Sequence, residues 1–399
     1  MSLEEHKRYL VENYAIPKIE ILRGKGTKLW DTEGNEYLDF TSGIAVTNIG
    51  HSHSEWVKAI SEQSKVLTHC SNLYSIPEQV RLAKRLVERI GPGKLIFCNS
   101  GAEANEGMIK LSRMVADQSE DSERNEIIVA KNAFHGRTMG ALSATASSKY
   151  RNGFEPLLPG FRFADYNDLN AFESAITHNT RAIMIESIQG EGGIHMASKE
   201  FLRKLEKVCN ERNLLLLMDE VQAGIGRTGE FLGFQHAGIQ PSAIAMAKGL
   251  GGGFPIGAIW ISEKWAGAFK PGSHGTTFGG SPLACSAAHS VLDVMEKEHL
   301  IQKAAELGNY LKGKLVEFVA KYPKLIIEVR GRGLMLGLVM IENPSTAINQ
   351  MRQKGLLVVG AAGNSIRFLP PLTVEKKEID HALCVVEEVL GNLQSDFPL

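Results

Sequence analysis

The chain has 399 residues, of which 43% are hydrophobic and 22% charged, as expected for a soluble globular protein. Its 44 basic and 45 acidic residues are spread along the chain and leave a net charge of −1, which disfavours a nucleic-acid or membrane surface. No apolar run approaches the roughly 20 residues of a membrane helix, and the charged start MSLEEHKRYL lacks the core of a secretory signal. Five scattered cysteines without metal-type spacing indicate reduced thiols, a cytoplasmic location and no metal site.

The predicted elements change character along the chain. Residues 27–30 and 36–40 are expected to form a hairpin around a loose turn. From residue 50, helices and strands alternate, which predicts an α/β domain with a mainly parallel sheet. The expected helices are 54–64, 77–90, 102–116 and 199–212, and the expected strands are 94–99, 127–130, 181–187, 214–218 and 244–247.

The last part of the chain has a separate α+β pattern. A long helix is expected from Pro282 towards Glu298. It is followed by predicted helices at 301–322 and 376–393 and predicted strands at 326–329, 334–339, 356–359 and 365–368. We therefore expect three segments, 1–49, 50–290 and 291–399, and an exposed polar loop at 117–125.

Two apolar runs lead to the most informative side chains. Leu214–Met218 ends at Asp219 and Glu220, and 244–247 ends at Lys248, before a glycine-rich loop. Ligands of parallel sheets bind outside the carboxyl ends of the strands. A carboxylate and an amine there suit a pyridine cofactor, because the aspartate keeps the ring nitrogen protonated while the lysine binds the aldehyde as a Schiff base and later shuttles a proton. A surface lysine is the alternative, but the apolar and glycine neighbours disfavour it.

The segment Asn99–Asn105 lies where a strand turns into a helix. Free N–H groups at a helix start bind anions, and Gly101 lets a phosphate approach closely. Alternatively, Ser100 is only a helix cap with Glu103 as its capping-box partner.

Three further side chains follow predicted strands. Phe134 could stack on a planar ring and Arg137 could bind a carboxylate with its two-pronged guanidinium, or the two could be a core aromatic beside a surface arginine. Glu191 lies among glycines, where a carboxylate could swing, although an ordinary solvated turn glutamate would look the same. Gln222 could bond the hydroxyl of the ring.

In combination these residues resemble the class III pyridoxal-phosphate (PLP) aminotransferases of fold type I. The similarity covers nearly the whole chain, and the sequence looks most like the acetylornithine aminotransferase branch, which belongs to arginine biosynthesis. The motifs that carry it are GTKLWDTEGNEYLDFTSGIAVTNIGH (26–51), FCNSGAEANEGMIKLSR (97–113), FHGRTMGALSAT (134–145), QGEGG (189–193), LLLMDEVQAGIGRTG (215–229), AKGLGGGFPIGA (247–258), HGTTFGGSPLA (274–284) and RGRGLMLGL (330–338).

The resemblance implies a fold and a cofactor site. A large α/β domain with a seven-stranded, mainly parallel sheet would accompany a smaller α+β domain formed by the N-terminal segment and the C-terminal part. Lys248 and Asp219 would be the catalytic pair. Thr277 would contact the phosphate of the cofactor in the opposite subunit, which implies a homodimer with shared active sites. The cofactor-binding residues would be Gly101, Ala102, Phe134, Asp219, Glu220, Val221, Gln222, Lys248 and Thr277.

The resemblance also implies how two substrates share one pocket. Arg137, with Thr276 nearby, would bind the α-carboxylate of the donor, and Arg367 that of glutamate. Glu191 would neutralise Arg367 for the ω-amino substrate and release it for glutamate. The expected reaction moves the terminal amine of N2-acetyl-L-ornithine to 2-oxoglutarate and gives N-acetylglutamate 5-semialdehyde and glutamate.

Some positions depart from the family pattern and leave more than one activity open. Ser54 and Ser187 replace prolines, Ser281 replaces an asparagine and Thr276 replaces a serine, and none of these changes removes a catalytic group. Ornithine, succinylornithine, succinyl-diaminopimelate and 4-aminobutyrate are alternative donors, although ornithine-specific members place a tyrosine in the region of Ile44. An aminomutase, a decarboxylase and a non-enzymatic binding protein on the same fold are three further hypotheses.

Overall fold

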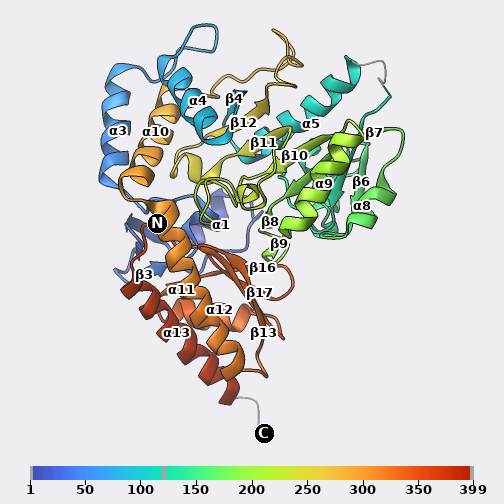
Figure 1. The fold of residues 1–399 in the computed structure, drawn as a ribbon. Coiled ribbons are helices and arrows are strands. Elements are labelled where there is room, and N and C mark those ends of the chain that lie inside the picture. The colour runs from blue at the N-terminus through green and yellow to red at the C-terminus, as the bar shows by residue number, and fades with distance from the viewer. Residues whose placement is uncertain (1–2, 119–122, 396–399) are drawn as a thin grey trace.

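A seven-stranded sheet lies at the centre of the larger part of the molecule (Figure 1). The structure is a computed structural model that describes residues 3–118 and 123–395. The strand order is β4-β12-β11-β10-β7-β5-β6, and only β12 runs antiparallel to its neighbours. The expected mainly parallel seven-stranded sheet is thus confirmed. Its strands are β4 (Gly93–Cys98), β5 (Glu126–Ala130), β6 (Phe161–Ala164), β7 (Thr180–Glu186), β10 (Leu215–Asp219), β11 (Ala243–Met246) and β12 (Gly257–Ser262).

Helices bury both faces of this sheet, which explains why its strands are continuous apolar runs. Leu215 and Leu217 on β10 pack in a buried cluster with α5, whereas Leu216 and Met218 pack in a second cluster with helices of the other face. The helices that supply these clusters are α5 on one face and α4, α9 and α10 on the other: α4 (Pro77–Ile90), α5 (Gly101–Asp117), α9 (Lys199–Glu211) and α10 (Pro282–Lys297).

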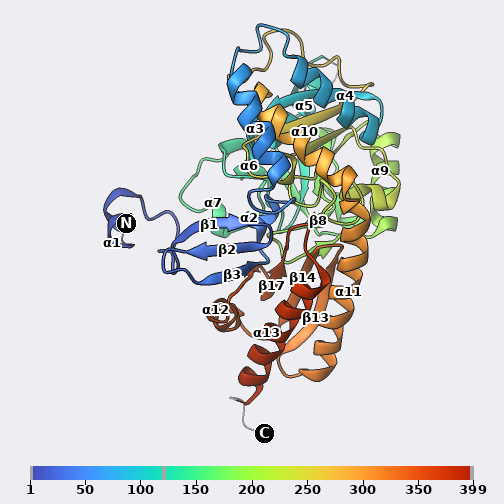
Figure 2. The ribbon, with the colours of Figure 1, turned by 90° about the vertical axis from the view of Figure 1, so that its left-hand side faces the viewer.

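Two smaller sheets form the second part of the molecule. The antiparallel sheet β13-β14-β17-β16 is covered by α11 and α13. In the other sheet the order is β1-β2-β3-β15, so a C-terminal strand pairs in parallel with N-terminal β3. Strands β1, β2 and β3 accordingly lie next to the C-terminal part of the chain (Figure 2). The bounds are β1 (Ile21–Lys25), β2 (Lys28–Asp31), β3 (Glu36–Asp39), β13 (Ile326–Arg332), β14 (Met335–Met340), β15 (Leu356–Leu357), β16 (Val359–Ala361), β17 (Ser365–Phe368), α11 (Leu300–Lys321) and α13 (Lys376–Ser395).

The remaining elements are short or lie at the periphery. The segment boundaries at residues 49 and 290 stay predictions, and residue 290 lies inside α10. These elements are α1 (Leu3–Tyr9), α2 (Ser42–Ala45), α3 (Ser54–Val66), α6 (Met139–Ala144), α7 (Ser148–Arg151), α8 (Leu169–Ala175), α12 (Ser345–Gln353), β8 (Ile188–Gln189), β9 (His195–Met196) and the 3-10 turns Gly233–Ala237 and Lys248–Leu250.

The structure differs from the sequence-based prediction in several elements. The strand expected at 356–359 is divided between β15 and β16, which belong to different sheets. Two strands of the central sheet, β6 and β12, and strand β1 of a smaller sheet were not predicted. β6 is a short edge strand with partly exposed side chains, so its hydrophobic pattern is weak. Part of the loop predicted at 117–125, residues 119–122, lies outside the described residues.

A helix that crosses a bilayer needs roughly 20 predominantly apolar residues. Within residues 3–118 and 123–395, no helix combines the length and the apolar character that a membrane crossing requires.

Candidate active site

The carboxyl ends of five parallel strands meet at one edge of the central sheet. Each end leads into a segment that carries a residue singled out in the sequence. Because such an edge is where ligands of α/β sheets bind, the fold brings these segments to one site. The strands and the residues at or beyond their carboxyl ends are β4 with Gly101, β5 with Phe134, β7 with Glu191, β10 with Asp219 (its last residue) and β11 with Lys248.

Lys248 begins the tight turn that follows β11. Its φ of 45° lies in the left-handed region, an uncommon conformation for a residue other than glycine. Gly249 packs so closely on Asn48 that a Cβ would not fit. The side chain of Lys248 is only partly accessible, and no hydrogen bond or ion pair to its Nζ is found among the described residues. Desolvation lowers its pKa to about 8, which leaves a reactive amine close to neutral pH.

Asp219 is a buried carboxylate held from both oxygens. Oδ2 lies 2.7 Å from Nδ1 of His135 and accepts a 2.7 Å hydrogen bond from Nδ2 of Asn105. Oδ1 accepts from the N–H of Val221 at 3.0 Å. This network, which the sequence-based reasoning did not assign, sets the direction in which the carboxylate points. Asn105 and His135 both belong to motifs quoted above, 97–113 and 134–145, but their contact with Asp219 was not predicted.

The N-terminus of α5 has both a side-chain cap and free N–H groups, the two features that the sequence left as alternatives. Oγ of Ser100 accepts from the N–H of Glu103 at 3.1 Å, so the predicted helix cap is present. Oε2 of Glu103 accepts from the N–H of Asn99 at 2.6 Å, one residue before the cap, and not from Ser100 as a capping box would require. The N–H groups of Gly101 and Ala102 have no acceptor among the described residues. Val221 packs against Gly101 and leaves no room for a Cβ there. A capped helix and free amides for an anion therefore coexist.

Arg367 on β17 is buried and already paired. Its Nη1 donates to Oε1 of Glu191 and to Oε1 of Gln222, both at 2.7 Å. The side chain of Arg367 is 1% exposed and that of Glu191 is 21% exposed. Burial alone would raise the pKa of Glu191, but the charge and hydrogen bond of Arg367 outweigh it and lower that pKa. Gln222 bonds Arg367 in this structure, and its expected bond to a ring hydroxyl stays a prediction.

Arg137 has different surroundings. It is exposed, and its guanidinium carbon lies 4.2 Å from the ring centroid of Tyr150 and 5.7 Å from that of Phe134. The two rings meet edge to face at 5.3 Å. Among the described residues no carboxylate pairs with Arg137. Tyr150, on the short helix α7, was missed by the sequence-based reasoning.

Thr276 and Thr277 lie on a loop beside the β4–α5 junction. Oγ1 of Thr276 accepts from Nδ2 of Asn99 at 3.3 Å and from the N–H of Gly279 at 3.1 Å. Thr277 is exposed. No contact of Thr276 with Arg137 is found within the described part of one chain, so the expected vicinity of these two stays a prediction.

Two buried glutamates complete the surroundings of the site. Glu186 lies opposite Asp219 in the sheet and accepts from the N–H groups of Phe134 at 3.3 Å and Gly190 at 3.4 Å. Burial and the charge of Asp219 raise its pKa well above the usual range. Glu220 instead bonds the N–H groups of Gly233 and Phe234, and burial raises its pKa to about 7. Its contact with a cofactor stays a prediction.

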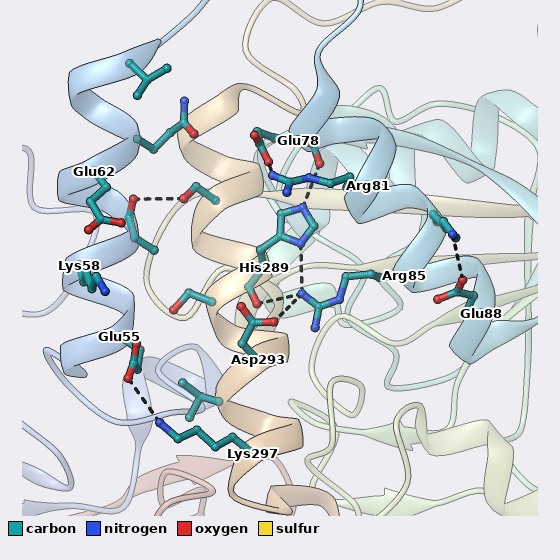
Figure 3. Close-up of a pocket in the computed structure, with 17 residues that line it drawn as sticks. Glu55, Lys58, Glu62, Glu78, Arg81, Arg85, Glu88, His289, Asp293 and Lys297 are labelled. Atoms are coloured by element: carbon teal, nitrogen blue, oxygen red, sulfur yellow. Dashed lines mark hydrogen bonds and ion pairs between the residues drawn. The ribbon is translucent and has the colours of Figure 1, made fainter.

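A separate groove of about 830 Å³ lies between α3, α4 and α10 (Figure 3). Its charged side chains pair with one another: Arg85 with Asp293 at 2.8 Å, and Lys297 with Glu55 at 3.5 Å. None of the residues singled out in the sequence lines it. It is not part of the site at the sheet edge.

Comparisons with known proteins agree with this geometry. The sequence matches the family described as aminotransferase class-III over residues 9–390. It is 47% identical to the acetylornithine aminotransferase of Caldanaerobacter subterraneus subsp. tengcongensis over 97% of this chain and 98% of that protein. It is 48% identical to the acetylornithine aminotransferase of Aquifex aeolicus over 96% of this chain and all of that protein.

Solved structures give the same fold. The ornithine aminotransferase of Toxoplasma gondii ME49 superposes with a TM-score of 0.95 at 31% identity, over 100% of this chain and 97% of that one. The acetylornithine aminotransferase of Elizabethkingia anophelis gives a TM-score of 0.87 at 31% identity, over 98% of both chains. The expected fold type I architecture and the expected PLP-dependent transaminase class are thus confirmed. With a family match across nearly its full length, this chain belongs to the class III aminotransferases.

Proposed function

We propose that this chain transfers the terminal amine of N2-acetyl-L-ornithine to 2-oxoglutarate and yields N-acetylglutamate 5-semialdehyde and glutamate. The observation that carries the proposal is that the site has two arginines, one paired with a carboxylate and one without such a partner among the described residues. Arg367 is covered by Glu191, and Arg137 has no carboxylate partner among the described residues. A site that accepts a terminal amine in one half-reaction and an α-amine in the other needs this asymmetry.

The side chains at the sheet edge fit pyridoxal 5'-phosphate. Asp219 presents a buried carboxylate for the pyridine nitrogen, and the amine of Lys248 has no protein partner among the described residues. The free N–H groups of Gly101 and Ala102 suit the phosphate. Phe134, with Val221, would flank the ring. When bound, this cofactor supplies an electron sink for the substrate carbon that loses its proton.

Protein groups supply the proton transfers and the orientation. With a pKa near 8, Nζ of Lys248 can accept and return a proton at neutral pH. His135 and Asn105 hold the carboxylate of Asp219 in one direction, so it need not reorganise during the reaction.

Glu191 acts as the switch between substrates. While it bonds Arg367, the pocket offers no free cation there to a donor that reacts through its terminal amine. The α-carboxylate of glutamate competes for Arg367 and displaces Glu191. Glycines on both sides of Glu191 allow the backbone to follow this movement.

We further propose a homodimer in which Thr277 reaches the phosphate of the cofactor in the other subunit. Thr277 is exposed, and the neighbouring Phe278 is 62% exposed, as is expected of residues that a second subunit covers. Leu73 and Tyr74, whose loop is joined to this one through Asn72, are 87% and 70% exposed. We also propose that the protein works in the cytoplasm. The proposed segments of the chain are 1–49, 50–290 and 291–399.

Ornithine is the second candidate donor because of the structural similarity to the Toxoplasma gondii enzyme. Ile44 lies in the left-handed turn Ser42–Ala45 with a φ of 65° and packs against an apolar cluster that includes Ile188 and Ala223. It offers no hydroxyl to the charged α-amine of free ornithine, which favours an acylated donor.

A donor panel tests this function. With 2-oxoglutarate as acceptor, kcat/KM should be highest for acetylornithine among acetylornithine, succinylornithine, ornithine and 4-aminobutyrate. A higher value for ornithine would replace the proposed donor. Consumption of donor without formation of glutamate would instead indicate an aminomutase or a decarboxylase.

A further inference from the structure

The guanidinium of Arg137 is held by aromatic rings instead of by an acid. It is exposed, and its contacts are the ring of Tyr150 at 4.2 Å and the ring of Phe134 at 5.7 Å. A long, exposed arginine loses rotamer freedom when it binds a ligand, and this loss weakens binding. An arginine that is already stacked on a ring has lost most of that freedom beforehand.

Tyr150 is itself held in place. It belongs to α7 (Ser148–Arg151), is partly buried, and meets Phe134 edge to face with an interplanar angle of 76°. Phe134 in turn follows β5, whose carboxyl end is part of the site. The orientation of Arg137 is therefore linked through two rings to the rigid sheet.

The charges of both arginine sites act on Tyr150. Burial raises the pKa of its hydroxyl, the charge of Glu191 raises it further, and the charges of Arg137 and Arg367 lower it. These influences place the ring within electrostatic reach of both ends of the pocket. A guanidinium that lies over an aromatic face keeps its N–H edge free, so it can still bind a carboxylate through two hydrogen bonds.

We propose that Tyr150 is a specificity-determining residue, whose ring positions the guanidinium of Arg137 to receive the α-carboxylate of the amino donor. This inference rests on the proposed function, because it takes over the donor and the role of Arg137. Tyr150 is a positioning residue, since it acts through Arg137.

The test compares two donors that differ by one carboxylate. N-acetyl-1,4-diaminobutane is acetylornithine without its α-carboxylate. The ratio of kcat/KM for acetylornithine to that for N-acetyl-1,4-diaminobutane should fall about tenfold in Tyr150→Leu. Tyr150→Phe retains the ring and should keep the ratio of the wild type. Phe154→Leu removes an exposed aromatic ring four residues away and should also keep it.

A binding measurement on the holoenzyme accompanies the kinetics. N-acetyl-L-norvaline retains the α-carboxylate of acetylornithine and lacks its terminal amine, so it binds without reacting. Its Kd by calorimetry should rise about tenfold in Tyr150→Leu and stay near the wild-type value in Tyr150→Phe. In an Arg137→Gln background, Tyr150→Leu should change the donor ratio by no more than about twofold, because no guanidinium remains to be held.

Each result decides between explanations. A ratio that stays at the wild-type value in Tyr150→Leu, or that falls equally in Tyr150→Phe, would overturn the role of the ring. An undiminished effect of Tyr150→Leu in the Arg137→Gln background would show that it does not act through Arg137. Failure of the wild type to prefer acetylornithine over its decarboxylated analogue would instead refute the proposed donor.

Discussion

The two arginines of the site lie in opposite surroundings. Arg367 is buried and bonded to Glu191 and Gln222, whereas Arg137 is exposed and lies on aromatic faces. A buried cation without a partner would cost several kcal/mol, so Arg367 needs its own counter-ion whenever no substrate covers it. An exposed cation keeps its water and needs only orientation. The difference suggests that substrates are exchanged at Arg367 and that the donor is recognised at Arg137.

Both half-reactions, with the donor and with glutamate, are expected to use the same amine, Nζ of Lys248. Lys248→Ala should lower the rates of both by about 10³-fold or more, because the same Nζ moves the proton in each. Single-turnover measurements with acetylornithine and with glutamate test this, with circular dichroism as the control for folding. If Lys248→Ala kept one half-reaction near its normal rate, Lys248 would not serve both half-reactions.

Removal of the buried cation should separate the two half-reactions. Arg367→Gln should lower kcat/KM for glutamate by about 100-fold, because a charge-assisted pair with its α-carboxylate is lost. The acetylornithine half-reaction should lose far less, since Glu191 covers Arg367 in that step. Equal losses in both half-reactions would show that the two arginines do not have separate tasks.

Removal of Glu191, the counter-ion of Arg367, should change the apparent affinities for the two substrates in opposite directions. In Glu191→Gln the guanidinium of Arg367 has no carboxylate partner, so KM for glutamate should fall and KM for acetylornithine should rise, each by about tenfold. Steady-state kinetics with each substrate varied at a saturating level of the other measures both. Unchanged KM values would mean that Glu191 does not compete with glutamate.

The sequence predicted the strand ends better than the side-chain contacts between them. Asp219 and Lys248 follow apolar runs buried on both faces, a pattern that is visible without the fold. Asn105 and His135 were not assigned because they meet Asp219 across 114 and 84 residues of sequence. Only the assembled sheet brings them together.

The sequence also did not predict Tyr150 or the partner of Gln222, for different physical reasons. Tyr150 lies on a four-residue helix, which is too short to show a periodic pattern. The expected bond of Gln222 to a ring hydroxyl stays a prediction, whereas its 2.7 Å bond from Arg367 was not foreseen because 145 residues of sequence separate the two. The role expected of Thr277 involves the cofactor of a second subunit, so the contacts within one chain do not determine it.

The smallest predicted effect concerns pH. Only a neutral amine attacks an aldehyde, and burial lowers the pKa of Lys248 from about 10.4 for an ordinary lysine to about 8. The rate at which the apo-protein takes up pyridoxal phosphate should therefore rise about tenfold or less from pH 7 and level off above pH 8. Stopped-flow absorbance measures it. A rate that keeps rising to pH 10 would mean that Lys248 titrates as an exposed lysine does.

The fate of one nitrogen atom is the sharpest test of the proposed reaction. Acetylornithine labelled with ¹⁵N in its terminal amine is incubated with 2-oxoglutarate, the holoenzyme and, in parallel, the Lys248→Ala variant. We expect ¹⁵N-glutamate with the wild type and none with the variant. Consumption of acetylornithine with unlabelled glutamate, or with no glutamate, would contradict the proposed reaction.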